Sequence, residues 1–164
     1  MSTLPENAPA LFTAGVIEGM IPDLDVKDLL LECFKPDPEF AEMADNMMVA
    51  LKEKDVPKVQ DLMFQLTPKA FEDAEPCGED DKFAKVSQAA ARQGKLFKLV
   101  ADDGPMASMR AMRSVTQHTK EFRKNVSRAG DKWGKGKYYS AGLEIGTMNK
   151  LIFEPWEKEM LEAE

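Results

Sequence analysis

Residues 37–66 read DPEFAEMADNMMVALKEKDVPKVQDLMFQL, and this stretch decides the fold class. Asp37-Pro38 and Asp55-Val56-Pro57 each place a capping residue before a proline, which loses no hydrogen bond there because the first N–H groups of a helix have no internal partner. The apolar residues then recur three and four positions apart, as on one face of a helix: Phe40, Met43, Ala44, Met47, Met48, Leu51, and again Val59, Leu62, Met63 and Leu66. The stretch therefore predicts two consecutive helices.

The same signals extend through the rest of the chain. Thr67-Pro68 and Gly104-Pro105 repeat the helix-start pattern, and strand-like alternation is absent. We predict an all-α, compact multi-helix bundle of about seven or eight helices with no sheet, in which short loops favour antiparallel neighbours. The expected helices cover about residues 10–20, 24–34, 38–53, 56–66, 68–75, 80–101, 105–129 and 136–153, with a short tail helix near 155–163.

Length and composition indicate one domain over residues 1–164, with a polar arm at 1–9 and an acidic tail at 155–164. The chain has 164 residues, 43% of them hydrophobic and 31% charged, which is ordinary for a globular protein and argues against wholesale disorder. No apolar run approaches the ~18–20 residues that span a bilayer. The polar, acidic start does not resemble a signal peptide. We therefore expect either a cytosolic protein or a mature form without its leader.

Two short segments share the pattern Ala-Gly-x-x-x-Gly. They contain Gly15 and Gly19 near the start of the chain, and Gly142 and Gly146 near its end. Glycine inside a helix costs about 0.5–1 kcal/mol relative to alanine, so two glycines on one helix face suggest a compensating close contact. We expect helix–helix packing here, with these two helices against each other as one arrangement that would satisfy it. A groove that admits a flat ligand or a partner helix is the alternative.

The distribution of charge is lopsided. Residues 106–137 contain nine bases and two acids, whereas the chain as a whole has a net charge of −7. Along the helix expected at 105–129, one stripe contains Met112, Val115, Thr119, Phe122 and Val126. Another stripe would form a basic face that binds a partner: Arg110, Arg113, Lys120 and Lys124. An acidic protein or an anionic membrane would suit this face. Neutralisation by acidic helices of the same domain is the alternative, and nucleic acid is disfavoured because the chain is acidic, with a pI near 4.9.

Recognisable catalytic and metal-binding patterns are missing, so we predict no catalytic residue, cofactor or metal site. His118 is the single histidine and has no orienting carboxylate or nucleophile that the sequence identifies. The acidic residues between Glu72 and Asp81 do not follow the spacing of a calcium-binding loop. Cys33 and Cys77 lack the C-x-x-C spacing of a zinc site, and their separation allows either one disulfide or two free thiols.

A set of short motifs marks a resemblance. They are FTAGVIEG at 12–19, LLLEC at 29–33, FEDAEPC at 71–77 and KYYSAGLEIG at 137–146. Together they resemble a loosely defined family of small, helical, two-cysteine proteins of ciliates and other protists, mostly secreted or lumenal, for which no biochemical function is established. The resemblance implies a helical bundle and a Cys33–Cys77 disulfide, and it provides no catalytic residues. If the disulfide forms, we expect a lumenal or secreted location, and otherwise a cytoplasmic one.

The leading functional prediction is a non-catalytic structural or accessory subunit that binds a protein partner within a larger assembly. The basic face, the glycine segments and the N-terminal arm would be its contact surfaces. The alternative is a carrier of an apolar ligand, such as a lipid or pigment, in a cavity between helices lined by methionine and phenylalanine. An enzyme is the least favoured class, since no catalytic constellation is recognisable.

Overall fold

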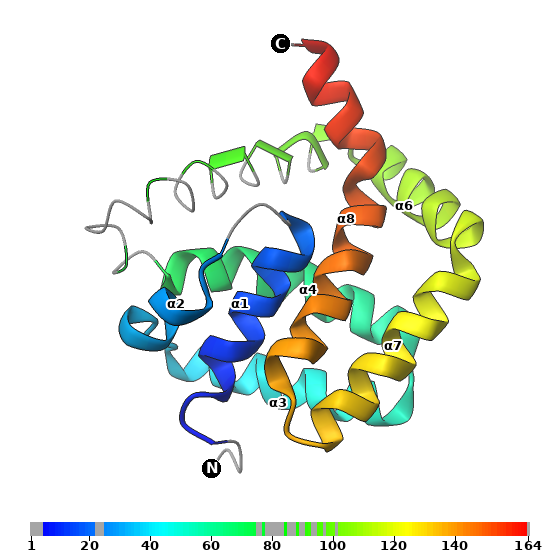
Figure 1. The fold of residues 1–164 in the computed structure, drawn as a ribbon. Coiled ribbons are helices and arrows are strands. Elements are labelled where there is room, and N and C mark those ends of the chain that lie inside the picture. The colour runs from blue at the N-terminus through cyan, green and yellow to red at the C-terminus, as the bar shows by residue number, and fades with distance from the viewer. Residues whose placement is uncertain are drawn as a thin grey trace.

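A computed structural model describes residues 5–21, 25–74, 77, 84, 88, 91–92, 95–96, 98–100 and 102–163 (Figure 1). The predicted all-α class is confirmed, because the described residues form helices and no strand. The helices in the described part of the chain are α1 (Ala8–Met20), α2 (Lys27–Cys33), α3 (Pro38–Glu53), α4 (Val56–Asp73), α6 (Pro105–Gln117), α7 (Thr119–Gly134) and α8 (Tyr138–Ala163).

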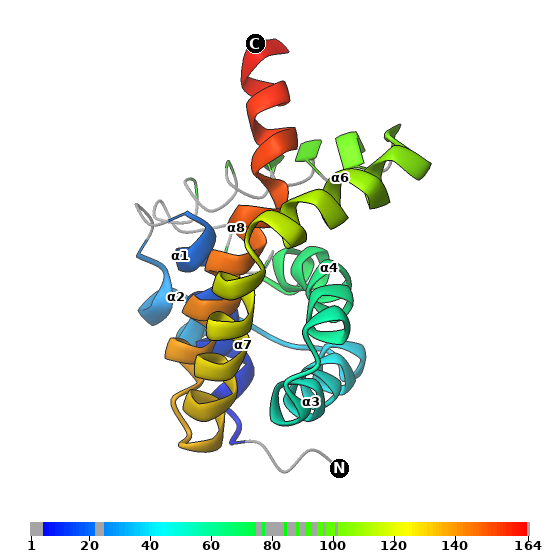
Figure 2. The same ribbon diagram turned by 90° about the vertical axis from the view of Figure 1, so that its right-hand side faces the viewer.

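The main core lies between a layer formed by α1, α7 and α8 and the helix pair α3–α4 (Figure 2). Asp37 and Asp55 start α3 and α4 as predicted, each accepting a hydrogen bond from a backbone N–H three residues later, at 2.9 Å and 3.3 Å. Large side chains from all five helices fill the interior and are almost completely buried: Phe12, Ile17, Phe40, Met47, Leu51, Met63, Leu66, Phe122, Ile145, Met148 and Ile152. This packing stabilises the bundle and fixes which helix faces remain exposed.

A second, smaller apolar cluster lies beyond the main core, around the C-terminal half of α8. Phe153, Trp156 and Met160 of that helix bury themselves together with Leu96, and Ala107 and Ala111 of α6 pack against them. Residues 155–163 are therefore not the separate acidic tail that the sequence predicted. They form the last turns of α8, and their apolar side chains hold α6 in place.

The prediction of a helix boundary before Pro155 is wrong, because α8 continues through this proline. Proline has no N–H and leaves the carbonyl four residues earlier, that of Leu151, without its helical donor. The hydroxyl of Ser114 donates to that carbonyl at 3.0 Å, so α6 supplies the missing hydrogen bond. The buried ring of Trp156 adds the packing that favours a continuous helix.

Residues 56–66 and 68–75 were likewise expected as two helices, whereas α4 runs without interruption from Val56 to Asp73. Thr67 does not cap a new helix. It is buried, and its hydroxyl donates to the Met63 carbonyl four residues earlier, at 2.8 Å. Burial of Leu66 and Ala70 on the same side of α4 favours one helix over a break at Pro68.

The helix predicted over 105–129 is divided at His118, which has non-helical backbone angles (φ −119°, ψ 25°). The Thr119 hydroxyl donates to the Thr116 carbonyl at 3.1 Å across this point, and such a bond competes with the regular helical pattern. The division changes which side chains face inward. Met112 is 68% exposed, so its expected place in a buried stripe is wrong.

Gly130 was expected to begin a loop and instead lies inside α7. A Cβ atom at this position would lie 2.8 Å from the carbonyl oxygen of Leu51, so the glycine allows α7 to approach α3. The helix predicted at 80–101 falls largely outside the described residues; those of its residues that the structure describes are helical. Residues 5–7 precede α1 as part of the predicted N-terminal arm.

Candidate partner-binding surface

The two glycine segments lie against each other along the contact between α1 and α8. A Cβ atom at Gly15 would come within 2.8 Å of the Gly142 Cα, and one at Gly146 within 2.9 Å of the Gly19 Cα. The two backbones therefore touch, as small residues permit. Each glycine face is filled by the other helix, so neither forms a groove that is open to a ligand.

A pair of titratable side chains lies beside this contact. The Tyr139 hydroxyl donates to a carboxylate oxygen of Glu18 at 3.1 Å, and the Lys27 ammonium lies 4.7 Å from the centre of the Tyr139 ring. Burial raises the pKa of Glu18, against the opposing effect of the Tyr139 hydrogen bond. Burial also raises the pKa of the Tyr139 hydroxyl. This arrangement connects α1, α2 and α8, and it is structural in character.

Cys33 and Cys77 form a disulfide, with their Cα atoms 5.3 Å apart. Nearby, the Lys69 ammonium of α4 contacts carboxylates on both α3 and α4: Asp37, Glu39, Glu72 and Asp73. The hydrogen bond from Lys69 lowers the pKa of Asp37, whereas burial raises the pKa of Asp73. The ion cluster holds the start of α3 against the end of α4, and the disulfide joins the end of α2 to Cys77, just beyond α4.

Arg110, which was predicted to belong to the basic face, is engaged in contacts within the protein. Its guanidinium donates to Asp103 at 2.8 Å and to Glu159 at 2.9 Å, and it lies over the Trp156 ring at 4.7 Å. Trp156 also donates its indole N–H to Asp103 at 2.6 Å. This indole bond, together with Arg110, lowers the pKa of Asp103. Arg110 therefore joins α6 to α8, and the expectation that it is available to a partner is wrong.

The other three residues predicted for the basic face have no such contacts among the described residues. Arg113, Lys120 and Lys124 are exposed, and none forms an ion pair within the described part of the chain. Arg123 and Arg128, on the outward side of α7, share these properties. Sequence reasoning counted these two among the bases but did not assign them to the face. The break at His118 rotates α7 relative to α6, and the single-helix pattern could not show this.

Most carboxylates close to this surface already have a cationic partner. Glu144 accepts from Lys132 at 2.8 Å, and Asp103 and Glu159 accept from Arg110. Glu121 and Asp131 are the acids of α7, and neither is paired with a lysine or arginine among the described residues; Glu121 shares a hydrogen bond of 2.6 Å with His118. We define the basic surface as the five exposed, unpaired bases of α6 and α7: Arg113, Lys120, Arg123, Lys124 and Arg128.

A row of exposed methionines precedes the basic surface on α6. Met106 is 55% exposed, Met109 is 58% exposed and Met112 is 68% exposed. They recur every three residues, so they lie on the outward side of the helix, opposite Ala107, Ala111 and Ser114. We call them the methionine row. Their exposure is contrary to the sequence pattern, because an apolar residue at helical spacing is usually buried.

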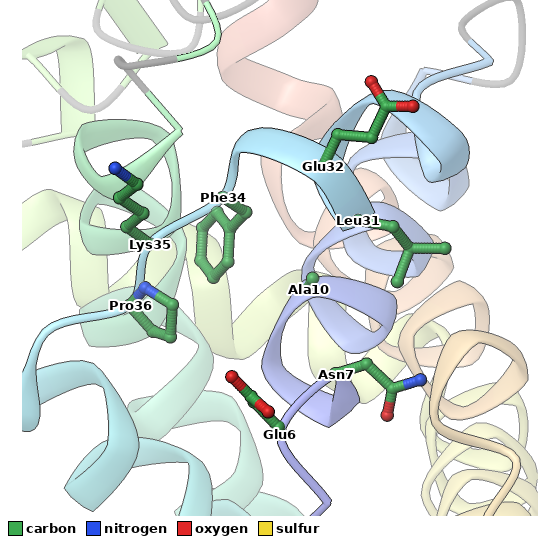
Figure 3. A pocket seen from close by; sticks show the side chains of 8 residues that line it. All are labelled: Glu6, Asn7, Ala10, Leu31, Glu32, Phe34, Lys35 and Pro36. Atoms are coloured by element: carbon green, nitrogen blue, oxygen red, sulfur yellow. The ribbon is translucent and has the colours of Figure 1, made fainter.

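An open groove, which the sequence did not reveal, lies between the start of α1 and the end of α2 (Figure 3). Its volume is about 740 Å³. Apolar groups come from Ala10, Leu31, Phe34 and Pro36, and the polar groups include two carboxylates, Glu6 and Glu32, and the ammonium of Lys35. Figure 3 shows Ala10 between Phe34 and Leu31, with Glu32 directed outward from α2.

Comparison with known proteins assigns no family. No family model matches the chain, and neither the curated proteins nor the solved structures contain a significant match. The resemblance to two-cysteine protist proteins therefore stays a prediction. None of the helices over the described residues combines the length and apolar character that crossing a bilayer requires. No cluster of candidate metal ligands occurs within the described ranges.

Proposed function

We propose that the protein is a non-catalytic interaction subunit that binds an acidic protein partner through the basic surface of α6 and α7. One observation carries the proposal: five neighbouring bases are exposed and unpaired, in a chain whose net charge is −7. If the bases only balanced the acids of the same domain, Arg113, Lys120 and Lys124 would be expected to form ion pairs as Arg110 does. Unpaired bases of this kind favour an external counter-charge.

The overall negative charge does not oppose such binding. At physiological ionic strength the field of an exposed charge falls off over about 8 Å, so a partner at α7 responds mainly to nearby groups. Among those groups Glu144 and Glu159 are already paired with cations, and the two remaining acids of α7, Glu121 and Asp131, are fewer than the five bases of the basic surface. A carboxylate-rich partner surface would therefore meet a local excess of positive charge.

The carrier hypothesis receives no comparable support. The glycine faces of α1 and α8 fill one another, and the large methionine and phenylalanine side chains of the main core pack against each other. The same helix packing suits a rigid scaffold that presents a surface.

A charge-reversal experiment tests the proposal. The double variant Lys120→Glu with Lys124→Glu is used as bait in a pull-down from extract of the native source, and it should no longer retain the partner. Its free energy of unfolding, measured by thermal melting, should stay within about 1 kcal/mol of wild type, because exposed charges contribute little to stability. Retention by the wild-type protein should weaken steadily as salt rises. A lower melting temperature of the variant, together with unchanged binding of the partner, would refute the proposal, because it would show that these lysines stabilise the fold and do not bind the partner.

Lys95→Glu with Lys98→Glu provides a matched control. These two lysines are exposed, lie outside the basic surface and undergo the same change of charge. The control should retain the partner at every salt concentration at which wild type does. Equal loss of binding in both variants would mean that net charge, and not the basic surface, governs association.

A further inference from the structure

The methionine row on α6 and the groove beside α2 form a complementary pair within one chain. The first is a convex helix face with three apolar side chains and one base, Arg113, one turn after Met109. The second is a concave site with apolar groups and two carboxylates, Glu6 and Glu32. Among the described residues five large hydrophobic side chains are exposed, and four belong to these two sites: Met106, Met109, Met112 and Leu31.

The two sites cannot meet within one molecule. Figures 1 and 2 place α2 and α6 on opposite sides of the bundle. In the packing of the described helices α2 lies against α1, whereas α6 lies against α7 and α8. A contact between the methionine row and the groove therefore requires two copies of the chain.

We propose that copies of this chain associate head to tail, with the methionine row of one copy seated in the α1–α2 groove of the next. Methionine is long and flexible, so it fits an irregular apolar site without exact shape matching. The groove volume of about 740 Å³ accommodates several such side chains. Phe34 and Leu31 supply apolar contacts, and Arg113 lies at the edge of the row, where a carboxylate of the groove can meet it.

Charge complementarity supports this occupant. The groove contains two carboxylates against the one ammonium of Lys35, so its net charge is negative, whereas Arg113 is unpaired among the described residues. Interfaces are enriched in methionine and arginine relative to the rest of a protein surface, which is the composition of the row. Because the two contact sites differ, the interface is heterologous and each added copy exposes a fresh groove and a fresh row. Association should therefore be stepwise and concentration dependent.

Sedimentation equilibrium of the purified chain tests the proposal directly. The mass-average molar mass should rise above the 18.3 kDa monomer as the concentration increases from micromolar toward millimolar. Met109→Ser with Met112→Ser should weaken association at least fivefold, a factor that corresponds to about 1 kcal/mol. Val49→Ser is the matched control, since Val49 is an exposed apolar residue of α3, 43% exposed and outside both sites, and this variant should associate like wild type.

A mixture of two charge-reversed variants tests whether Arg113 of one copy meets Glu32 of the next. Arg113→Glu alone opposes Glu32 of the next copy, and Glu32→Arg alone opposes Arg113, so each variant should be monomeric. Mixed together, the two variants can form both the wild-type contact between Arg113 and Glu32 and the charge-reversed contact between the same two positions. The mixture should therefore regain association and, like wild type, grow beyond a dimer, whereas each variant alone stays monomeric.

Three results would overturn the proposal: a wild-type chain that stays monomeric, a mixture that does not dimerise, or association unaffected by the methionine variant. The variants leave Lys120 and Lys124 unchanged, and the reversal of those lysines leaves the row and groove unchanged. Failure of self-association and failure of partner binding at α7 are therefore separable. Circular dichroism on each variant verifies that it is folded.

Discussion

Substitution of Gly15 by alanine tests the packing of α1 against α8. The new Cβ would lie 2.8 Å from the Gly142 Cα and 2.8 Å from the Leu143 nitrogen, and closer still to the Tyr139 carbonyl oxygen. All three are backbone atoms, which cannot rotate away as the end of a flexible side chain can. Carbon atoms in favourable contact are about 3.5–4.0 Å apart, so the helices must separate by roughly 1 Å.

The magnitude follows from two opposing effects. A separation of 0.5–1 Å removes about a quarter to a half of each dispersion contact along the helix pair, and overpacking in cores costs about 1–3 kcal/mol. Alanine recovers about 0.5–1 kcal/mol through its better helix propensity. We therefore expect Gly15→Ala to lower the free energy of unfolding by about 1–2 kcal/mol, which lowers the melting temperature by roughly 2–8 °C in a protein of this size.

Urea and thermal unfolding followed by circular dichroism measure this change. Gly134→Ala is the matched control, because Gly134 ends α7 and a Cβ there meets no atom within 4 Å. The control should be as stable as wild type or slightly more stable. If Gly15→Ala proves equally neutral, the close backbone contact of α1 and α8 is not present in solution and the reasoning fails.

Three further predictions concern the disulfide, a buried carboxyl group and the attachment of α6. Replacing Cys33 and Cys77 by serine should cost about 2–4 kcal/mol in urea unfolding, and alkylation of the folded, unreduced protein should add no mass; two adducts would contradict the bond. Burial raises the pKa of Glu18, so the native state loses stability as pH rises from the usual value of 4.5 through the raised one. Glu18→Gln should therefore raise the melting temperature at pH 7 but not below pH 4.5, and an equal effect at both would refute this. Arg110→Met should speed amide exchange in α6 and cost about 1–3 kcal/mol; unchanged exchange would exclude its role as a link to α8.

The fold class and several helix starts were predictable because they depend on local chemistry. Asp37 and Asp55 precede prolines and cap their helices wherever those helices pack. Helix boundaries predicted at Pro68 and Pro155 were wrong, because tertiary contacts, and not local sequence, decide whether a helix continues through a proline. The Ser114 hydroxyl that compensates for Pro155 comes from another helix and has no local signal.

The candidate surfaces were only partly predictable. The excess of bases in residues 106–137 is visible in the composition, but the hydrogen bonds of Arg110 depend on Asp103 and Glu159, and Glu159 lies 49 residues away. The break at His118 exposes Met112, and a periodicity argument over one long helix places it inside. The α1–α2 groove joins residues 6–10 with residues 31–36, which only the folded chain brings together.

Zero-length carbodiimide cross-linking of the native complex tests the central claim most directly, because it joins a lysine amine only to a carboxylate in contact with it. We expect partner peptides linked through aspartate or glutamate to Lys120 and Lys124 of α7, with yields that fall as salt rises. The control lysines, Lys95 and Lys98, should give no partner links. Partner links at Lys95 and Lys98, with none at Lys120 and Lys124, would contradict the assignment of the basic surface as the partner-binding site.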